Sequence, residues 1–467
     1  MPYIAADRRQ NLLLPISVDE YISTDDPVRA YDAFVEQLDF SQLGIRIDAH
    51  RVGHPEFDPY SMLKLLVYGY SYGVRSSRKL ERATHHNLSF VWLMGGLKPD
   101  HKTIARFRRN HCNALKGVLK QCAQLCAKLG LIEGNTLFVD GTKIRANASM
   151  KNTWTPERCR KSLQEIDARI EAILEECEAA DAGEEQQPSL VSRHRGLGDQ
   201  RKLKERVQRI LDELRSEEKT ATNTTDRQSG RMRNGAQIEA GYNCQVVTDD
   251  RHGLIVHSEV VNQSNDMGLF SQQIDVAQQT LGHSCKTAVA DSGFSSPEDL
   301  RRILDQGVDV VVPIVRHSDF RDHFTYESKT DRYRCPKGRP LKYIGDHKDH
   351  QSRIYQITDA SICRNCSGWG SCTTAVKGRR VERPYTEEIR ERLERRGQQA
   401  DASVLMRRRK QRAEHPFGHI KHNLGIRMFL LRGLKGVRAE TALATTAFNI
   451  RRMITLMGVR VLAGTLA

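Results

Sequence analysis

The sequence of 467 residues lacks any run of about eighteen apolar residues, the length that a transmembrane helix requires. Its N-terminus also lacks the succession of charged, apolar and small-residue segments that marks a secretory signal peptide. Both absences argue against a membrane protein and against an exported one. We therefore expect a cytoplasmic protein.

The sequence also lacks the even set of cysteines that a disulfide framework needs, because it contains eleven. Most are scattered singly, which is typical of intracellular thiols. Residues 316–382 differ from the rest, and we predict that they form a cysteine-rich insertion resembling a zinc ribbon. Its four cysteines are Cys335, Cys363, Cys366 and Cys372.

Four thiolates with one Cys-x2-Cys pair fit a tetrahedral, structural Zn²⁺ site. The spacing is imperfect, because Cys335 stands alone and five residues separate Cys366 from Cys372. Four unligated thiols are the alternative. A site closed by four protein ligands leaves no open position, so zinc here would staple a small fold and would not catalyse a reaction.

Acidic residues are too few to balance the basic ones. The formal net charge is +15 and the pI is about 9.3. Residues 376–438 contain eighteen Lys and Arg against seven Asp and Glu, so +11 of the net charge lies there. Such clustering favours a polyanionic partner, nucleic acid before a membrane surface, over a merely basic protein.

Residues 1–120 are predicted to form a helical N-terminal domain. Apolar residues recur there at spacings of three and four, and Asp58 followed by Pro59 is a typical helix start. The last of the short helices carries three arginines, Arg106, Arg108 and Arg109. The region is either a DNA reader of the helix-turn-helix kind or a helical cap with a basic face.

Five apolar runs separated by turns and helices predict the strands of a core, at 136–140, 237–248, 253–261, 286–290 and 307–314. The first three are expected to form an antiparallel meander, whereas the last two, joined through helices, should be parallel. This order predicts an α/β fold, an RNase H-like mixed sheet with flanking helices. Its parts are residues 121–151, 223–315 and 383–467.

Residues 152–222 interrupt this core. Leu and Ile recur there at helical spacing on both sides of a polar stretch at 181–189. The pattern predicts an inserted helical hairpin. Such a hairpin is either a dimerisation arm or a solvated spacer.

Three acidic residues lie at positions suited to a shared metal site. Asp140 and Asp291 each end an apolar run that we predict to be a strand, and Glu414 is placed on the last helix. Carboxylates are the ligands that Mg²⁺ prefers, and a strand end holds them rigidly. Each one alone is more simply explained as a turn, a helix cap or an ion pair. Lys421, two turns after Glu414, is suited to a DNA phosphate.

Several short motifs are distributed along nearly the whole chain. They are Phe57-Asp-Pro-Tyr, Arg75-Ser-Ser-Arg, Lys98-Pro-Asp-His-Lys-Thr-Ile-Ala-Arg-Phe-Arg, Val139-Asp-Gly-Thr-Lys, Gly241-Tyr-Asn-Cys-Gln, Ala290-Asp-Ser-Gly-Phe, Glu414-His-Pro-Phe-Gly-His-Ile-Lys, Phe429-Leu-Leu-Arg-Gly-Leu and Thr446-Ala-Phe-Asn-Ile-Arg-Arg. In this combination the chain resembles the transposases of bacterial insertion sequences with a DDE catalytic domain. A Tyr-x2-Arg-x3-Glu-x6-Lys signature of related enzymes is only partly kept, since Arg407 and Lys410 stand at its Tyr and Arg positions.

The resemblance implies that Asp140, Asp291 and Glu414 are the catalytic triad that binds Mg²⁺ (or Mn²⁺). It implies nicking at the ends of an element and attack of the 3′-hydroxyl on target DNA. The expected partner is double-stranded DNA, bound by a homodimer associated with the nucleoid. DNA contacts are expected from Lys421, Arg408, Arg409, Arg106, Arg108 and Arg109.

Two other functions remain compatible with the sequence. One is a catalytically silent DNA-binding protein on the same fold, and the other is an RNase H-like nuclease without strand transfer. Asp226 and Asp266 are additional acids near the core, which either support the metal ligands or cap turns.

Overall fold

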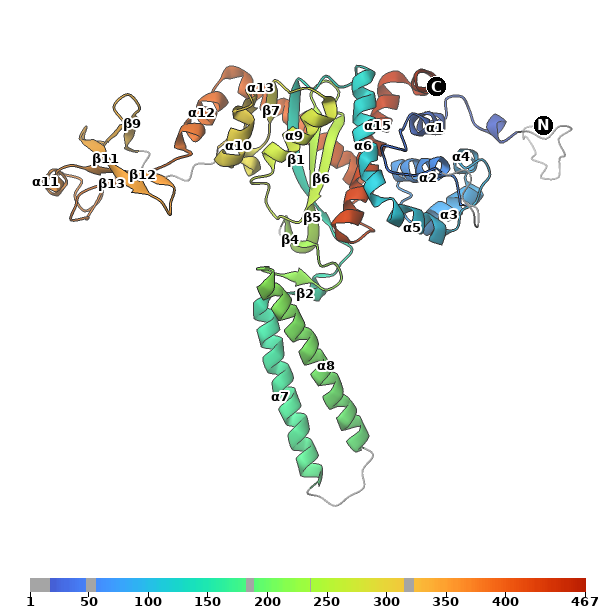
Figure 1. Cartoon of the computed structure of the whole chain (residues 1–467), viewed down its shortest axis with the longest axis horizontal. Helices are drawn as coiled ribbons and strands as arrows, with labels where there is room; N and C mark the ends of the chain where they lie inside the picture. Colours follow the sequence, from blue (N-terminus) through green and yellow to red (C-terminus); the bar gives the residue numbers. More distant parts are fainter. Residues whose placement is uncertain (1–16, 48–55, 182–188, 236, 315–322) are drawn as a thin grey trace, which may run out of the picture.

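The computed structural model describes residues 17–47, 56–181, 189–235, 237–314 and 323–467. Helices pack beside a central sheet, a long helical hairpin projects from it, and a small separate sheet lies at one end of the molecule (Figure 1). None of the described helices combines the length and the apolar character that a membrane span needs.

The central sheet contains both antiparallel and parallel strands, as the sequence predicts. β1 pairs antiparallel with β5, and β5 pairs antiparallel with β4 and β6. On its other side β1 pairs in parallel with β7, and β7 with β8. The strands are β1 (Thr136–Arg145), β4 (Gly230–Asn234), β5 (Gln237–Asp249), β6 (Ile255–Val261), β7 (Thr287–Val289) and β8 (Asp309–Val311).

The prediction that the first strand ends at Asp140 is wrong. β1 continues to Arg145, because β5 pairs with all of it from Leu137 onward. The polar character of residues 141–145 concealed this half of the strand, since an antiparallel partner supplies backbone hydrogen bonds whatever the side chains. Within β1, only residues 136–138 pair with β7. Asp140 therefore lies where the parallel side of the sheet stops.

The N-terminal helices share one hydrophobic core with the central sheet. Asp58 caps α2 by accepting from the backbone N–H of Ser61, and Asp100 caps α5 in the same way. α15, buried along most of its length, packs against α2, α6 and β6. The helices are α1 (Val28–Glu36), α2 (Pro59–Ser71), α3 (Ser77–His86), α4 (Leu88–Leu93), α5 (His101–Asn110), α6 (Cys112–Lys128), α15 (Gly433–Met457) and α16 (Val459–Leu466).

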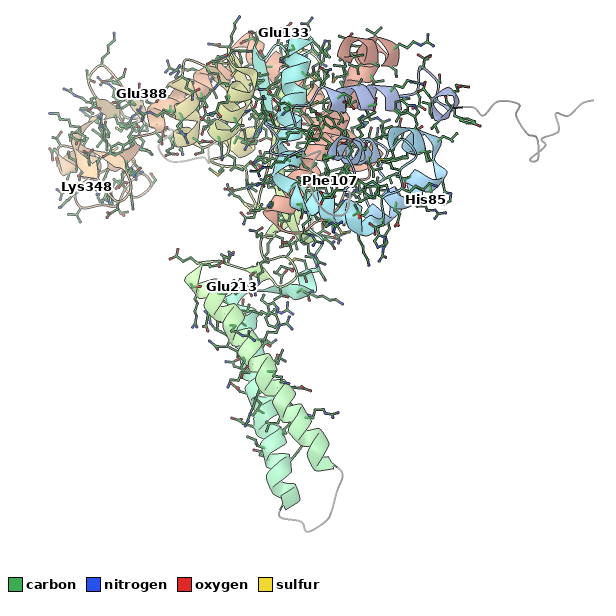
Figure 2. The ribbon with its side chains drawn as sticks, turned by 45° about the vertical axis from the view of Figure 1, so that its right-hand side comes forward. His85, Phe107, Glu133, Glu213, Lys348 and Glu388 are labelled. Atoms are coloured by element: carbon green, nitrogen blue, oxygen red, sulfur yellow. The ribbon has the colours of Figure 1, made fainter. Side chains whose placement is uncertain are left out.

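Two long helices, α7 (Pro156–Asp181) and α8 (Ser189–Ser216), form the projecting hairpin. They pack on each other through a small core that includes Ile166, Val207 and Leu214. Glu213 lies at the end of α8 that adjoins the rest of the molecule (Figure 2). β2 (Thr153–Trp154) and β3 (Thr222–Asn223) pair at the base. Most of the polar stretch predicted to join the helices, residues 182–188, lies outside the described residues.

A separate antiparallel sheet has a small hydrophobic core of its own. This core includes the side chains of Tyr333, Leu341, Tyr355 and Val381. The chain leaves it through α12 (Glu387–Gly397), where Arg396 forms ion pairs at 2.7 Å with Asp309 of β8 and with Asp401. The strands of this sheet are β9 (Thr325–Glu327), β10 (Arg332–Arg334), β11 (Pro340–His347), β12 (Ser352–Ile357) and β13 (Arg380–Pro384). Further helices of the chain are α9 (Phe270–Leu281), α10 (Pro297–Leu304), α11 (Ala360–Arg364) and α13 (Ala400–Arg409).

Candidate active site

Asp140 is the most buried of the three predicted metal ligands, with a side chain that is 10% exposed. Its Oδ1 accepts a hydrogen bond of 2.9 Å from the backbone N–H of Gly141. An added Cβ at Gly141 would meet Gln245 Nε2 at 2.4 Å and Asp266 Oδ1 at 2.8 Å, so a larger residue there would displace these two side chains. The side chains of Gln245 and Asp266 thus lie close to the backbone beside Asp140.

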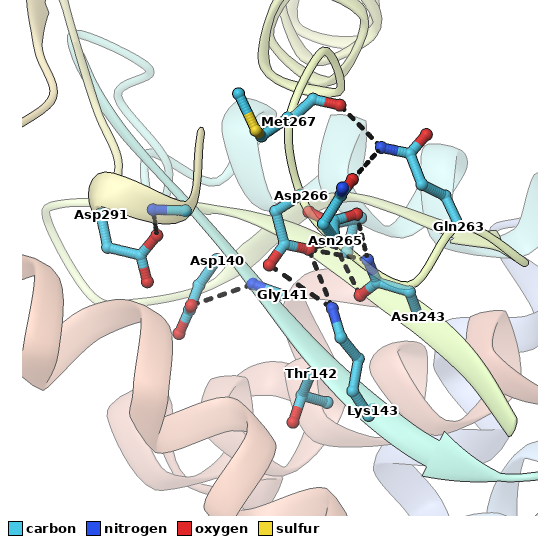
Figure 3. A network of polar contacts seen from close by, with 12 residues as sticks. Asp140, Gly141, Thr142, Lys143, Asn243, Gln263, Asn265, Asp266, Met267 and Asp291 are labelled. Atoms are coloured by element: carbon cyan, nitrogen blue, oxygen red, sulfur yellow. Dashed lines mark hydrogen bonds and ion pairs between the residues drawn. The ribbon is translucent and has the colours of Figure 1, made fainter. Parts of the chain in front are cut away.

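Asp291 follows β7 after one intervening residue and caps a short 3-10 turn, Ser292–Phe294. Its Oδ1 accepts from the backbone N–H of Gly293 at 2.8 Å, and its side chain is 40% exposed. Because β7 and β1 run in parallel, both acids lie near the same edge of the sheet (Figure 3).

Glu414 lies on a helical segment that follows α13 directly. The segment passes through a π-helical turn, Lys410–Glu414, then α14 (His415–Gly418), then a second π-helical turn, His419–Asn423. Pro416 has no N–H to donate, and the wider turns lie on both sides of it. The expectation that Glu414 comes from the last helix is wrong, since α15 and α16 follow.

Arg409, the last residue of α13, joins the three acids. Its Nη1 lies 3.3 Å from Asp140 Oδ1 and 3.9 Å from Asp291 Oδ2. Its Nη2 lies 3.2 Å from Glu414 Oε1. Three side chains from distant parts of the sequence therefore converge on a single cation.

Burial raises the pKa of Asp140 to about 6. The Arg409 guanidinium and the Gly141 N–H favour the carboxylate and oppose this shift, whereas Asp291 and Glu414 add to it by like-charge repulsion. Burial also lowers the pKa of Lys421, although the charge of Asp140 opposes that change. The centre of the site therefore contains more negative than positive charge.

A polar network around Asp266 adjoins Asp140 (Figure 3). The sequence indicated Asp266 only as an additional acid near the core. Asp266 Oδ1 accepts hydrogen bonds of 2.7 Å from Asn243 Nδ2 and from Gln245 Nε2. It also forms an ion pair of 3.1 Å with Lys143. Asp266 thus fixes the polar face of β5 beside Asp140. The only signal for this role in the sequence is the pair of polar residues, Asn243 and Gln245, at alternate positions of an apolar strand.

The residues expected to contact DNA differ in exposure. Lys421 Nζ donates to Thr142 Oγ1 at 2.6 Å, two residues beyond Asp140. Arg408 is half exposed and pairs with Asp250 at 2.7 Å. Arg106 and Arg109 are exposed on α5.

Two of the six are buried. Arg108 is 7% exposed, and its Nη1 donates to the backbone oxygen of Arg75 at 3.1 Å. Arg409 is 5% exposed and faces the acids. Their DNA contacts remain predictions.

The chemistry of the donor set fits a hard divalent cation, because all three acids offer oxygen and already surround one positive group. As the side chains stand, no set of three or more His, Cys, Asp or Glu within the described ranges is arranged to hold a metal ion. The Arg409 guanidinium lies between the three carboxylates.

The four predicted zinc ligands also come together. Cys335, Cys363, Cys366 and Cys372 line one cavity of about 580 Å³. Backbone N–H groups of Arg339, Gly368 and Arg379 donate to the sulfurs of Cys335, Cys366 and Cys363 at 3.4, 3.4 and 3.5 Å. In this part of the described chain, too, the thiols are not arranged to hold a metal as they stand.

Two family models match the sequence. One is described as "Transposase domain (DUF772)" and matches residues 16–110, and the other is described as "Transposase DDE domain" and matches residues 334–454. The second includes Glu414 and Arg409 but neither Asp140 nor Asp291. A search of curated proteins finds no significant match.

One solved structure is similar, a cryo-EM structure of a piggyBac transposase synaptic complex with hairpin DNA. The sequences are 9% identical, the TM-score is 0.26, and the likeness covers 92% of this chain and 82% of that one. A likeness at this level carries no argument about the fold.

Proposed function

This chain belongs to the insertion-sequence DDE transposases, and we propose that Asp140, Asp291 and Glu414 are the carboxylates with which it cuts DNA. The observation that supports this proposal is their convergence on Arg409. An RNase H-like core would account for it, because the order of β6, β5, β1, β7 and β8 brings both aspartates to one edge of the sheet.

Mg²⁺ or Mn²⁺, held by the three acids, would supply an activated water and relief of charge on the leaving oxygen. The chain's own residues do the positioning. β1 and β7 hold Asp140 and Asp291, while Lys421 lies close to Asp140, where it can pair with a DNA phosphate. Cleavage at the element ends, followed by joining of the 3′-hydroxyl to target DNA, is the reaction we assign.

The test uses labelled element-end DNA, Mg²⁺ and the full chain beside Asp140→Ala. We expect nicking and joining by the unmutated protein, and a loss of at least about a thousandfold in the variant. Binding without nicking would support a catalytically silent DNA-binding protein. Nicking without joining would support a nuclease on the same fold.

The remaining assignments are part of this proposal. Residues 1–120 and the basic segment 376–438 are the surfaces that we assign to double-stranded DNA. Residues 152–222 and 316–382 are insertions into the catalytic domain, and the DNA complex contains a homodimer. Its place in the cytoplasm, at the nucleoid, is a prediction as well.

We further propose that the four-cysteine cavity binds one structural Zn²⁺. Backbone N–H groups directed at three of the four sulfurs are suited to stabilise thiolates. Metal analysis of the purified chain should find about one zinc, and Cys363→Ser should lose it. Cys285→Ser, at a buried thiol outside the cavity, is the control that should keep it. Absence of zinc from the unmutated chain would contradict this proposal and leave the catalytic one standing.

A further inference from the structure

Arg409 is buried at the centre of the carboxylate site. Its side chain is 6% exposed, and its guanidinium faces all three acids within 3.9 Å. Within the described ranges only Nη2 makes a hydrogen bond, to Glu414 at 3.2 Å. Nε and Nη1 are buried and have no hydrogen-bond partner among the residues that the structure describes.

This arrangement differs from that of a fully satisfied ion pair. A buried arginine that only stabilises a fold has its donors satisfied, because an unmet buried donor costs free energy. Here Nε has no hydrogen-bond partner among the described residues, and Nη1 is held only by ion pairs, at 3.3 Å from Asp140 and 3.9 Å from Asp291. Three carboxylates also share one positive charge. The cluster is therefore short of both hydrogen bonds and positive charge.

A divalent cation would repair the shortage of charge, but it cannot share the place of the guanidinium. Both are cations, and the guanidinium already faces one oxygen of each of Asp140, Asp291 and Glu414, so a metal ion among them would lie close to a like charge. Carboxylates gathered without any cation would repel one another. A positive group among them relieves this repulsion.

We propose that Arg409 is a positioning residue that holds the three carboxylates together before metal binds and that gives up its place to the metal. It rests on the proposed function. Arg409 then lies at the rim of the site with unmet donors, and the partner that suits a guanidinium there is a phosphate oxygen of the bound DNA. Metal loading and DNA binding become coupled through this one side chain.

The experiment is a calorimetric titration of the full chain with Mn²⁺ alone, without DNA. Removing the competing cation in Arg409→Met should tighten Mn²⁺ binding by about ten- to a hundredfold. Arg408→Met is the matched control. It removes a neighbouring charge whose partner is Asp250, outside the site, and should leave the affinity unchanged.

The double variant Arg409→Met with Asp140→Asn should lose the tighter binding, which would locate it at the carboxylates. If circular dichroism shows Arg409→Met unfolded, Arg409→Gln takes its place, since it is neutral but still polar. Unchanged or weaker Mn²⁺ binding in a folded variant overturns the proposal.

The failure of this proposal is distinguishable from the failure of the proposed function. An unmutated chain that nicks DNA while Arg409→Met binds Mn²⁺ no more tightly overturns only the role of Arg409. An unmutated chain that never nicks DNA overturns the function, whatever the titration shows.

Discussion

Two buried arginine–carboxylate clusters in this protein have opposite characters. Glu440, on α15, is fully buried, and its carboxylate accepts from Arg75 Nη1 at 2.8 Å and from the backbone N–H groups of Leu430 and Leu431. Arg75 also donates to the backbone oxygens of Met428 and Gly425. At Arg409 one guanidinium faces three acids, and its Nε and Nη1 make no hydrogen bond to the described residues.

The comparison separates a structural ion pair from one that we propose to be functional. Burial raises the pKa of both Glu440 and Asp140, so burial alone does not distinguish them. Satisfaction of hydrogen bonds does. The Glu440 cluster ties the N-terminal helices to α15 and needs nothing further, whereas the Arg409 cluster retains the negative charge that a metal ion requires.

The largest effect is expected from breaking the satisfied cluster. Arg75→Met leaves the Glu440 carboxylate buried without its cation, which should lower the free energy of unfolding by about 3–5 kcal/mol. Chemical denaturation would measure the change. Arg460→Met removes an exposed pair with Asp25 and should cost no more than about 1 kcal/mol. Equal losses in the two variants would contradict the distinction.

The unsatisfied cluster should instead respond to pH. If Asp140 is a metal ligand, as we propose, a metal ion competes with the proton for its carboxylate, whose pKa is raised to about 6. Above pH 6 the carboxylate is free to bind, and below pH 6 the proton occupies it. Mn²⁺ affinity should therefore fall by about tenfold between pH 7 and pH 5.

Titration at several pH values would measure this change. In Asp140→Asn the part of the pH dependence that belongs to this group should vanish. An unmutated chain whose Mn²⁺ affinity stays constant down to pH 5 would show that Asp140 is not a ligand.

The smallest effect is expected at the edge of the same site. Lys421→Met should weaken binding of duplex DNA only a few-fold and reduce its salt dependence by about one counterion. Binding measured at several salt concentrations would show it. Thr142→Val removes the partner of Lys421 but keeps the positive charge, so its salt dependence should not change.

The acids were predictable from the sequence because each stands next to a recognisable pattern. The apolar runs before Asp140 and Asp291 predict buried strands, and the spacing from Glu414 to Lys421 belongs to a motif. The ends of the strands were less predictable from the sequence. β1 extends past Asp140 because pairing with β5 outweighs the polar character of its second half.

Arg409 illustrates the opposite case. In the sequence it stands in a run of basic residues, which predicts a solvated, DNA-facing surface. One of its neighbours, Arg408, is indeed half exposed. Nothing local indicates that the next side chain turns inward, because that direction depends on how α13 packs against β7 and on the π-helical turn after it.

The sequence by itself determined which residues carry charge, which runs are apolar enough to be strands, and that two acids, Asp140 and Asp291, stand at the end of such runs. These properties depend on composition and local periodicity, which each segment holds alone. Only the tertiary structure decided which cation the acids face and which arginine has its donors satisfied. Contacts between segments more than a hundred residues apart form when the sheet and helices pack, and no local pattern encodes their distances.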